Sequence, residues 1–130
     1  MRTGSKRMKF NKVEICCPEE SVLLKSRIYC VNYIETYWAI YGIRHTVVSL
    51  LYRCSVCKSK GEITADLQPW GKHFDFGHYK EFNEVVKSKH VDFTIKEAID
   101  KVHQMPGKYR LFKYNCHHWG KAYYKLLTQK

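Results

Sequence analysis

The segment that decides the fold is Arg44-His45-Thr46-Val47-Val48-Ser49-Leu50-Leu51-Tyr52. Its apolar residues occur at both odd and even positions, so as a strand it would point apolar side chains to both faces. Two apolar faces are typical of a strand inside a sheet that is covered on both sides. We therefore expect this segment, with His45 near its start, to be the central strand of the fold.

A hairpin follows the central strand. Residues 54–61 predict a turn, and residues 62–68 then alternate between polar and apolar side chains. This alternation predicts a second strand that lies nearer the edge of the sheet. Residues 22–33 are rich in Val, Leu, Ile and Tyr and predict another strand. Shorter extended segments are expected at 12–16, 73–78 and 109–114.

Four helices are predicted. The strongest covers 95–105, because Thr94 and Glu97 form a capping-box pattern at its start. The last runs from Asn115, which can cap it, to about Leu127. Weaker helical patterns cover 34–41 and 79–87.

The composition is that of one globular domain with a basic surplus. The chain has 130 residues, of which 45% are hydrophobic and 15% aromatic, enough for one core but too few for two ordinary domains. Residues 1–12 are polar and basic, and we expect a flexible tail there before a single domain at 13–130. The net charge of +11 favours acidic or polyanionic partners. Nucleic-acid binding by the tail stays open on this basis, but a solvated basic surface is the simpler interpretation.

The sequence predicts a cytoplasmic protein with free thiols. It contains no run of about 18 apolar residues that would span a membrane, and its N-terminus lacks the apolar segment of a secretory signal. Six cysteines are present, but Cys16 and Cys17 are adjacent, and the chain is large enough to fold without a disulfide framework. We expect Cys16, Cys17 and Cys30 to be structural, and we expect no cofactor.

The strongest chemical motif is Tyr114-Asn115-Cys116-His117-His118-Trp119-Gly120-Lys121. Asn115 can cap the helix and leave Cys116 in the first turn, where unpaired amides and the helix dipole favour a thiolate. A cysteine nucleophile needs a base on a rigid element, and His45 is the best placed of the seven histidines. The plainer alternatives are an inert buried cysteine and a hydrogen-bonded core histidine.

Two segments resemble the PPPDE thiol peptidases. Residues 42–48, Gly42-Ile43-Arg44-His45-Thr46-Val47-Val48, are similar to the Gly-Ile-x-His-[Thr/Ser] strand of that family, and residues 109–119 are similar to its Tyr-x-Leu-x-x-x-Asn-Cys-x-His-Phe segment. The order, histidine first and cysteine last, is that of permuted NlpC-like papain folds. The resemblance covers about residues 22–127 and is strong at the two motifs. The lecithin:retinol acyltransferase family shares a very similar Asn-Cys-x-His-Phe turn, so that turn does not choose between peptide and lipid chemistry.

The resemblance implies an α+β, permuted papain-like fold, in which a small antiparallel sheet packs against a C-terminal helix that carries the nucleophile. It also implies that Cys116 is the nucleophile, that His45 is its general base and that the Cys116 amide contributes to an oxyanion hole. The implied activity is that of a cysteine hydrolase acting on a peptide or isopeptide bond, with a ubiquitin-like conjugate as one candidate substrate. A thioester or lipid acyl group is the next choice. An inactive papain-like interaction domain would have the same pattern.

Three departures from the family pattern put the substrate in doubt more than the chemistry. Trp119 replaces the usual aromatic residue, Arg44 stands where the peptidases often carry Trp or Tyr, and their glycine-rich segment after the hairpin is missing.

A third polar residue often orients the base in papain-like sites. Three residues after the hairpin are candidates, and His73 is taken as the third catalytic residue ahead of Asp75 and His78. Helical geometry points His117 and His118 away from the Cys116 face. We expect His118 to cap or pack the helix start and His117 to be exposed to solvent.

A rival signal is Cys54-Ser55-Val56-Cys57, which resembles one knuckle of a zinc ribbon. It supports a second class of function, a zinc-stabilised basic module that binds nucleic acid or protein. A structural zinc ion needs four ligands, and no second Cys-x-x-Cys occurs. A hairpin turn that contains two thiols is the simpler interpretation, with a labile disulfide as a third, and we expect no metal there.

Overall fold

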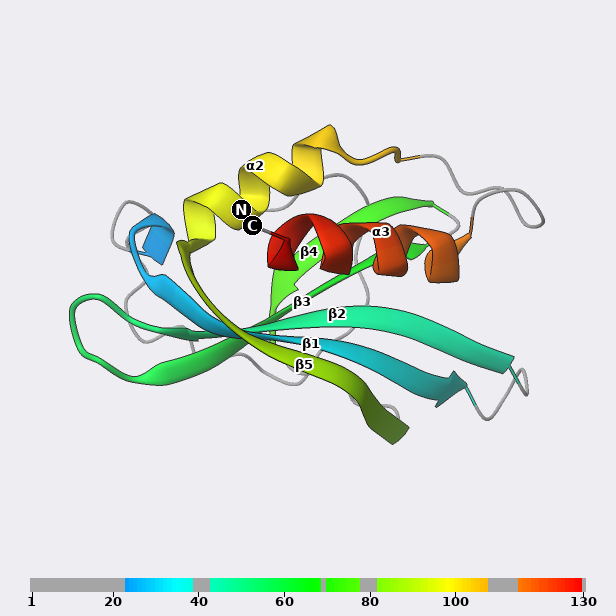
Figure 1. Ribbon diagram of the computed structural model, residues 1–130, viewed down its shortest axis with the longest axis horizontal. Coiled ribbons are helices and arrows are strands. Elements are labelled where there is room, and N and C mark those ends of the chain that lie inside the picture. The colour runs from blue at the N-terminus through cyan, green and yellow to red at the C-terminus, as the bar shows by residue number, and fades with distance from the viewer. Residues whose placement is uncertain (1–22, 39–42, 69, 78–81, 108–114, 130) are drawn as a thin grey trace.

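The computed structural model describes residues 23–38, 43–68, 70–77, 82–107 and 115–129. These residues form a five-stranded antiparallel sheet with the order β4-β3-β2-β1-β5, together with two helices (Figure 1). The strands are β1 (Arg27–Trp38), β2 (Ile43–Arg53), β3 (Lys60–Gln68), β4 (Gly71–Phe76) and β5 (Phe82–Thr94). The helices are α2 (Ile95–Gln104) and α3 (Cys116–Thr128). The expectation of an α+β fold with an antiparallel sheet and a C-terminal helix is confirmed.

The segment around His45 is the central strand, as its two apolar faces predict. β2 pairs with β1 on one side and with β3 on the other, and its residues from His45 to Leu50 are all buried. The turn after it is formed by Cys54–Ser59, where the Cys54 amide donates to the Ser59 carbonyl at 2.8 Å. The predicted hairpin is confirmed, and so is the position of β3 inside the sheet, next to the edge strand β4.

Two predicted helices are wrong, because the described parts of both segments are strands. Residues 34–38 belong to β1, where Ile34 pairs with Val47 of β2 and with Val85 of β5. Residues 82–87 belong to β5, the long edge strand that pairs with β1. The weak local preference for helix is overridden because each segment gains hydrogen bonds beside a neighbouring strand, with one irregularity in the β1–β5 pairing between Tyr33 and Ile34. The expected strand at 22–33 is shifted, since Leu23 and Leu24 are helical and β1 begins at Arg27.

Both helices lie on one side of the sheet (Figure 1). The helical stripe on α3 packs its large side chains, Trp119, Tyr123 and Leu127, into the main core. The Trp119 indole N–H donates to the Pro106 carbonyl at 3.0 Å, and the Tyr123 hydroxyl donates to the Ala98 carbonyl at 2.9 Å. The polar ends of these two aromatic residues therefore fasten α3 to α2 and to the segment after it.

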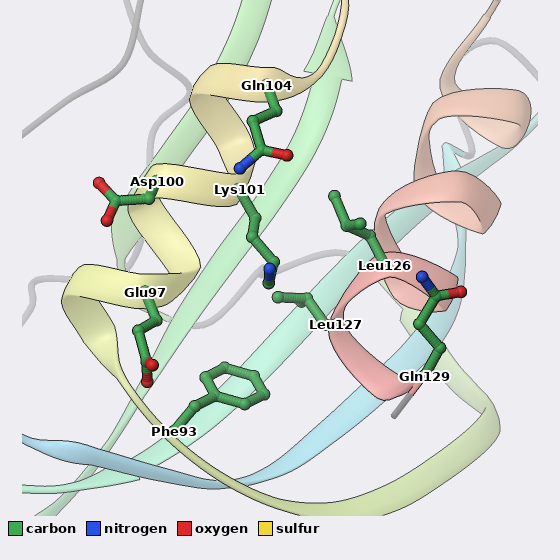
Figure 2. Close-up of a pocket in the computed structure, with 8 residues that line it drawn as sticks. All are labelled: Phe93, Glu97, Asp100, Lys101, Gln104, Leu126, Leu127 and Gln129. Carbon is green, nitrogen blue, oxygen red and sulfur yellow. The ribbon is translucent and has the colours of Figure 1, made fainter.

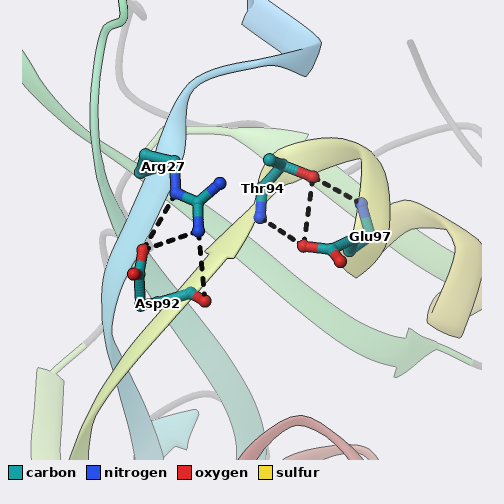
Figure 3. A network of polar contacts seen from close by, with 4 residues as sticks. All are labelled: Arg27, Asp92, Thr94 and Glu97. Atoms are coloured by element: carbon teal, nitrogen blue, oxygen red, sulfur yellow. Dashed lines mark hydrogen bonds and ion pairs between the residues drawn. The ribbon is translucent and has the colours of Figure 1, made fainter.

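The predicted capping box at the start of α2 is confirmed (Figure 3). The Glu97 amide donates to Thr94 Oγ1 at 3.2 Å, and the Thr94 amide donates to the Glu97 carboxylate at 2.7 Å. Close by, the Arg27 side chain of β1 bonds Asp92 of β5 at 2.9 Å. These contacts fix the point where β5 ends and the chain turns back over the sheet.

Several predictions concern residues outside the described ranges. They are the basic tail at 1–12, the extended segments at 12–16 and 109–114, and the structural thiols Cys16 and Cys17. In the part of the chain that the structure describes, neither helix has the length and apolar character needed to cross a membrane.

Candidate active site

Cys116 is the first residue of α3, as the Asn115 cap predicts. The Asn115 side-chain oxygen accepts hydrogen bonds from the His117 amide at 3.0 Å and the His118 amide at 3.4 Å. The Asn115 amide in turn donates to His118 Nδ1 at 3.3 Å, so His118 completes the cap as expected. Two amides of the first turn are thereby occupied, while the Cys116 amide has no hydrogen-bond partner among the described residues. That N–H is available to a developing oxyanion.

The structure brings His45 and Cys116 together, although they are far apart in sequence. The Cys116 side chain interacts with the His45 ring, and both residues are buried, with His45 only 2% exposed and Cys116 5% exposed. Burial by itself lowers the pKa of His45, but hydrogen bonds and charge interactions with Asp66 and Cys116 raise it to about 9. At neutral pH the His45 ring is therefore an imidazolium.

Asp66 of β3 is the direct partner of His45. Its Oδ2 lies 2.5 Å from His45 Nε2, and the carboxylate is only 1% exposed. The Gln68 side-chain amide donates to the same carboxylate oxygen and lies 3.3 Å from His45 Nε2. Cys116, His45 and Asp66 thus form a continuous buried chain of a thiol, an imidazole and a carboxylate.

Asp66 lies outside the motifs that the sequence offers. The alternation of β3 was interpreted as a polar face and an apolar face, but Thr64, Asp66 and Gln68 are as well buried as the apolar residues between them. A carboxylate on a strand paired with the histidine strand was the available signal. This signal depends on the register between β2 and β3. The observed pairs, from Val48 with Ala65 to Arg53 with Lys60, place Asp66 on the same face of the sheet as His45.

The expected third residues lie elsewhere in the site or outside it. His73 of β4 pairs across the sheet with Asp66, and its Nδ1 lies 3.6 Å from Asp66 Oδ1. It therefore contacts the oxygen that does not bond His45, and Asp66 lies between His73 and His45. Asp75 lies opposite Thr64, and its carboxylate accepts a hydrogen bond from the Phe76 amide at 2.9 Å. His78 is outside the described residues.

His117 differs from its expectation in one respect. The residue is exposed, as predicted, but its Nδ1 lies 2.6 Å from Oγ1 of the buried Thr46. The side chain is therefore hydrogen bonded to β2, next to His45, rather than directed only to solvent.

The Cys-x-x-Cys segment forms the turn between β2 and β3. Cys54 is buried and Cys57 is exposed. Lys58 has a φ of 67°, a left-handed conformation that a residue with a side chain seldom adopts. Within the described ranges, no group of three or more His, Cys, Asp or Glu side chains could hold a metal ion. Cys30 is buried, and its sulfur lies 3.3 Å from Ser88 Oγ.

An open pocket lies at the far end of α3 (Figure 2). It has a volume of about 530 Å³ and lies between α2, the end of α3 and Phe93 of β5. Leu127, on its wall, is eleven residues beyond Cys116 in the same helix, a separation of about 16 Å at the rise of an α-helix. The pocket is therefore separate from the Cys116 site.

Comparisons with known proteins give no relative: no protein-family model, no curated protein and no solved structure matches the chain.

Proposed function

We propose that the protein is a cysteine hydrolase of the permuted papain-like type, with Cys116 as nucleophile, His45 as acid and base, and Asp66 as the residue that orients His45. The observation that carries the proposal is the buried contact of His45 with both the Cys116 thiol and the Asp66 carboxylate. The chain order, with the histidine strand before the cysteine helix, also supports the permuted arrangement. Cysteine nucleophiles are activated by such a partner, and the partner is held by a third group.

The proposed reaction has two halves. The Cys116 sulfur attacks a carbonyl carbon, and the negative charge that develops on the oxygen is met by the Cys116 amide. The His45 imidazolium gives its proton to the leaving amine or alcohol, so that a thioester to Cys116 remains. Neutral His45 then takes a proton from a water molecule, the resulting hydroxide attacks the thioester, and the acid product leaves as the sulfur is restored.

A peptide or isopeptide bond is the proposed target, following the resemblance to thiol peptidases at residues 42–48 and 109–119. A ubiquitin-like conjugate is one candidate of that class. Thioester and lipid acyl groups form the second class, because the Asn115-Cys116-x-His118 turn also resembles that of the acyltransferases. A cysteine with a neighbouring histidine serves either reaction, since both proceed through a thioester.

The direct test is to trap the thioester. The full chain is incubated with p-nitrophenyl acetate and analysed by intact-mass and peptide mass spectrometry, with Cys116→Ala and Cys57→Ala as matched variants. One added acetyl group on Cys116, lost in Cys116→Ala and retained in Cys57→Ala, supports the proposal. Acetylation that follows exposure, on Cys57 ahead of Cys116, would contradict it, since Cys57 is the exposed thiol. Fluorogenic peptide, isopeptide and lipid ester substrates then separate the two classes.

A further inference from the structure

Thr46 joins the two elements that carry the candidate nucleophile and base. It follows His45 in β2, and its side chain reaches His117, which follows Cys116 in α3. The Thr46 side chain is fully buried, with 0% exposure. A residue adjacent to the base thus touches a residue adjacent to the nucleophile, one position away from the His45–Cys116 contact in each element.

The hydroxyl of Thr46 makes the polar half of this junction. Its Oγ1 lies 2.6 Å from His117 Nδ1. It also interacts with the Tyr33 phenol of β1, where burial raises the pKa of Tyr33 and the Thr46 hydroxyl lowers it. A threonine hydroxyl has one donor and two acceptor positions, so it can bond both neighbours at once. It can donate to a neutral His117 or accept from a protonated one.

The methyl group of Thr46 makes the apolar half. It lies against Gly120, one turn after Cys116, where a Cβ atom would stand only 2.4 Å from Thr46 Cγ2. That distance is far below van der Waals contact, so α3 can approach β2 this closely only because residue 120 is glycine. The Thr46 side chain therefore makes two contacts between β2 and α3, one through its hydroxyl group and one through its methyl group.

We propose that Thr46 is a positioning residue for the cysteine–histidine pair. Its hydroxyl is hydrogen bonded to His117, its methyl group packs against Gly120, and together these contacts hold the Cys116 sulfur against His45. This inference rests on the proposed function, because the geometry that it sets matters only if the pair reacts. A displacement of about 1 Å at a reacting centre can cost about 100-fold in rate. Loss of the Thr46 contacts should therefore lower the reactivity of Cys116 without unfolding the protein.

The first experiment removes the hydroxyl and keeps the shape. In Thr46→Val, the rate of carboxymethylation of Cys116 by iodoacetate at neutral pH should fall by about 10-fold or more, and its preference for iodoacetate over iodoacetamide should fall towards that of Cys57 in the same molecule. Thr46→Ser, which keeps the hydroxyl, should stay within about threefold of the wild type.

The matched control is Thr64→Val, because Thr64 is buried in the neighbouring strand and its hydroxyl has no hydrogen-bond partner among the described residues. Thr64→Val should leave the rate and the preference unchanged. Thermal unfolding measured alongside shows whether each variant is folded at the assay temperature. A purely structural role of Thr46 would lower the melting temperature and leave the reagent preference as it is.

A second experiment tests the methyl contact and does not need Thr46→Val to fold. Gly120→Ala should slow the labelling of Cys116, because the new methyl group meets Thr46 Cγ2. Adding Thr46→Ser removes that carbon atom and should restore most of the rate. Failure of the second change to restore the rate, or wild-type labelling in Gly120→Ala, would overturn the proposal.

His45→Gln, measured in parallel, separates the two levels of inference. If His45→Gln abolishes the reagent preference of Cys116 and Thr46→Val does not change it, the positioning role of Thr46 is wrong and the proposed cysteine–histidine pair is supported. If His45→Gln has no effect on the reagent preference either, the proposed function is wrong, and the positioning role of Thr46 is wrong with it.

Discussion

The Asp66 carboxylate and the His45 ring, 21 residues apart in the chain, meet inside the protein with 2.5 Å between Oδ2 and Nε2. Neither side chain is exposed by more than 3%. A buried carboxylate is costly to desolvate unless a charged or hydrogen-bonded partner compensates it. The protonated ring of His45 provides that compensation, and the same ring also interacts with Cys116.

The first prediction concerns which thiol reacts fastest. Exposure alone ranks Cys57 ahead of the buried thiols Cys30, Cys116 and Cys54. We expect iodoacetate at neutral pH to modify Cys116 faster than Cys57 in the native protein, because the imidazolium of His45 attracts the anionic reagent to the neighbouring sulfur. Competitive labelling followed by peptide mass spectrometry measures the order. In His45→Gln the order should revert to that of exposure, and a wild-type protein in which Cys116 lags behind Cys57 would exclude an activated sulfur.

The second prediction concerns the role of Asp66. In the wild type, the preference of Cys116 for iodoacetate over iodoacetamide should fall as the pH rises through about 9, where His45 loses its proton. Asp66→Asn keeps the shape of the side chain and removes its charge, so the same fall should occur at a lower pH. The ratio of the two labelling rates is measured from pH 5 to pH 10. A Glu62→Gln control on the same strand should keep the wild-type profile, and an unchanged profile in Asp66→Asn would show that Asp66 does not act on His45.

The third prediction concerns stability against pH. The pKa of His45 in the folded protein, about 9, lies above its value of about 6.5 in an unfolded chain, so its contribution to the free energy of unfolding is complete below pH 6.5. The contribution should be lost as the pH rises through 9, by roughly 3 kcal/mol. Urea denaturation between pH 6 and pH 10 should show this decline in the wild type. His45→Gln should remove most of it, whereas a change at the exposed His103 should not.

The fourth prediction concerns the turn between β2 and β3. Lys58 holds a left-handed conformation with φ of 67°, which costs a residue with a Cβ atom about 1 kcal/mol relative to glycine. Lys58→Gly should therefore raise the free energy of unfolding by about 0.5–1 kcal/mol, less the loss of the exposed bond from Lys58 Nζ to the Ser55 carbonyl. Urea unfolding at constant pH gives the value. Lys60→Gly, made two residues further on within β3, is the control and should destabilise the protein.

The sequence by itself determined the elements whose signals are local. The two apolar faces of residues 44–52 identified the central strand, the Thr94 and Glu97 pattern identified the start of α2, and Asn115 placed Cys116 at the start of α3. Caps and alternation depend on neighbours within a few residues, so they can be predicted without the rest of the fold.

Only the tertiary structure decided the remaining features, because each depends on partners distant in sequence. Residues 34–38 and 82–87 became strands because pairing with β2 and β1 outweighed a weak helical preference. Asp66 became the partner of His45 because strand register, which a shift of one residue would reverse, points both side chains to the same face. His117 reached Thr46 because Gly120 lets α3 lie closer to β2 than any side chain would allow.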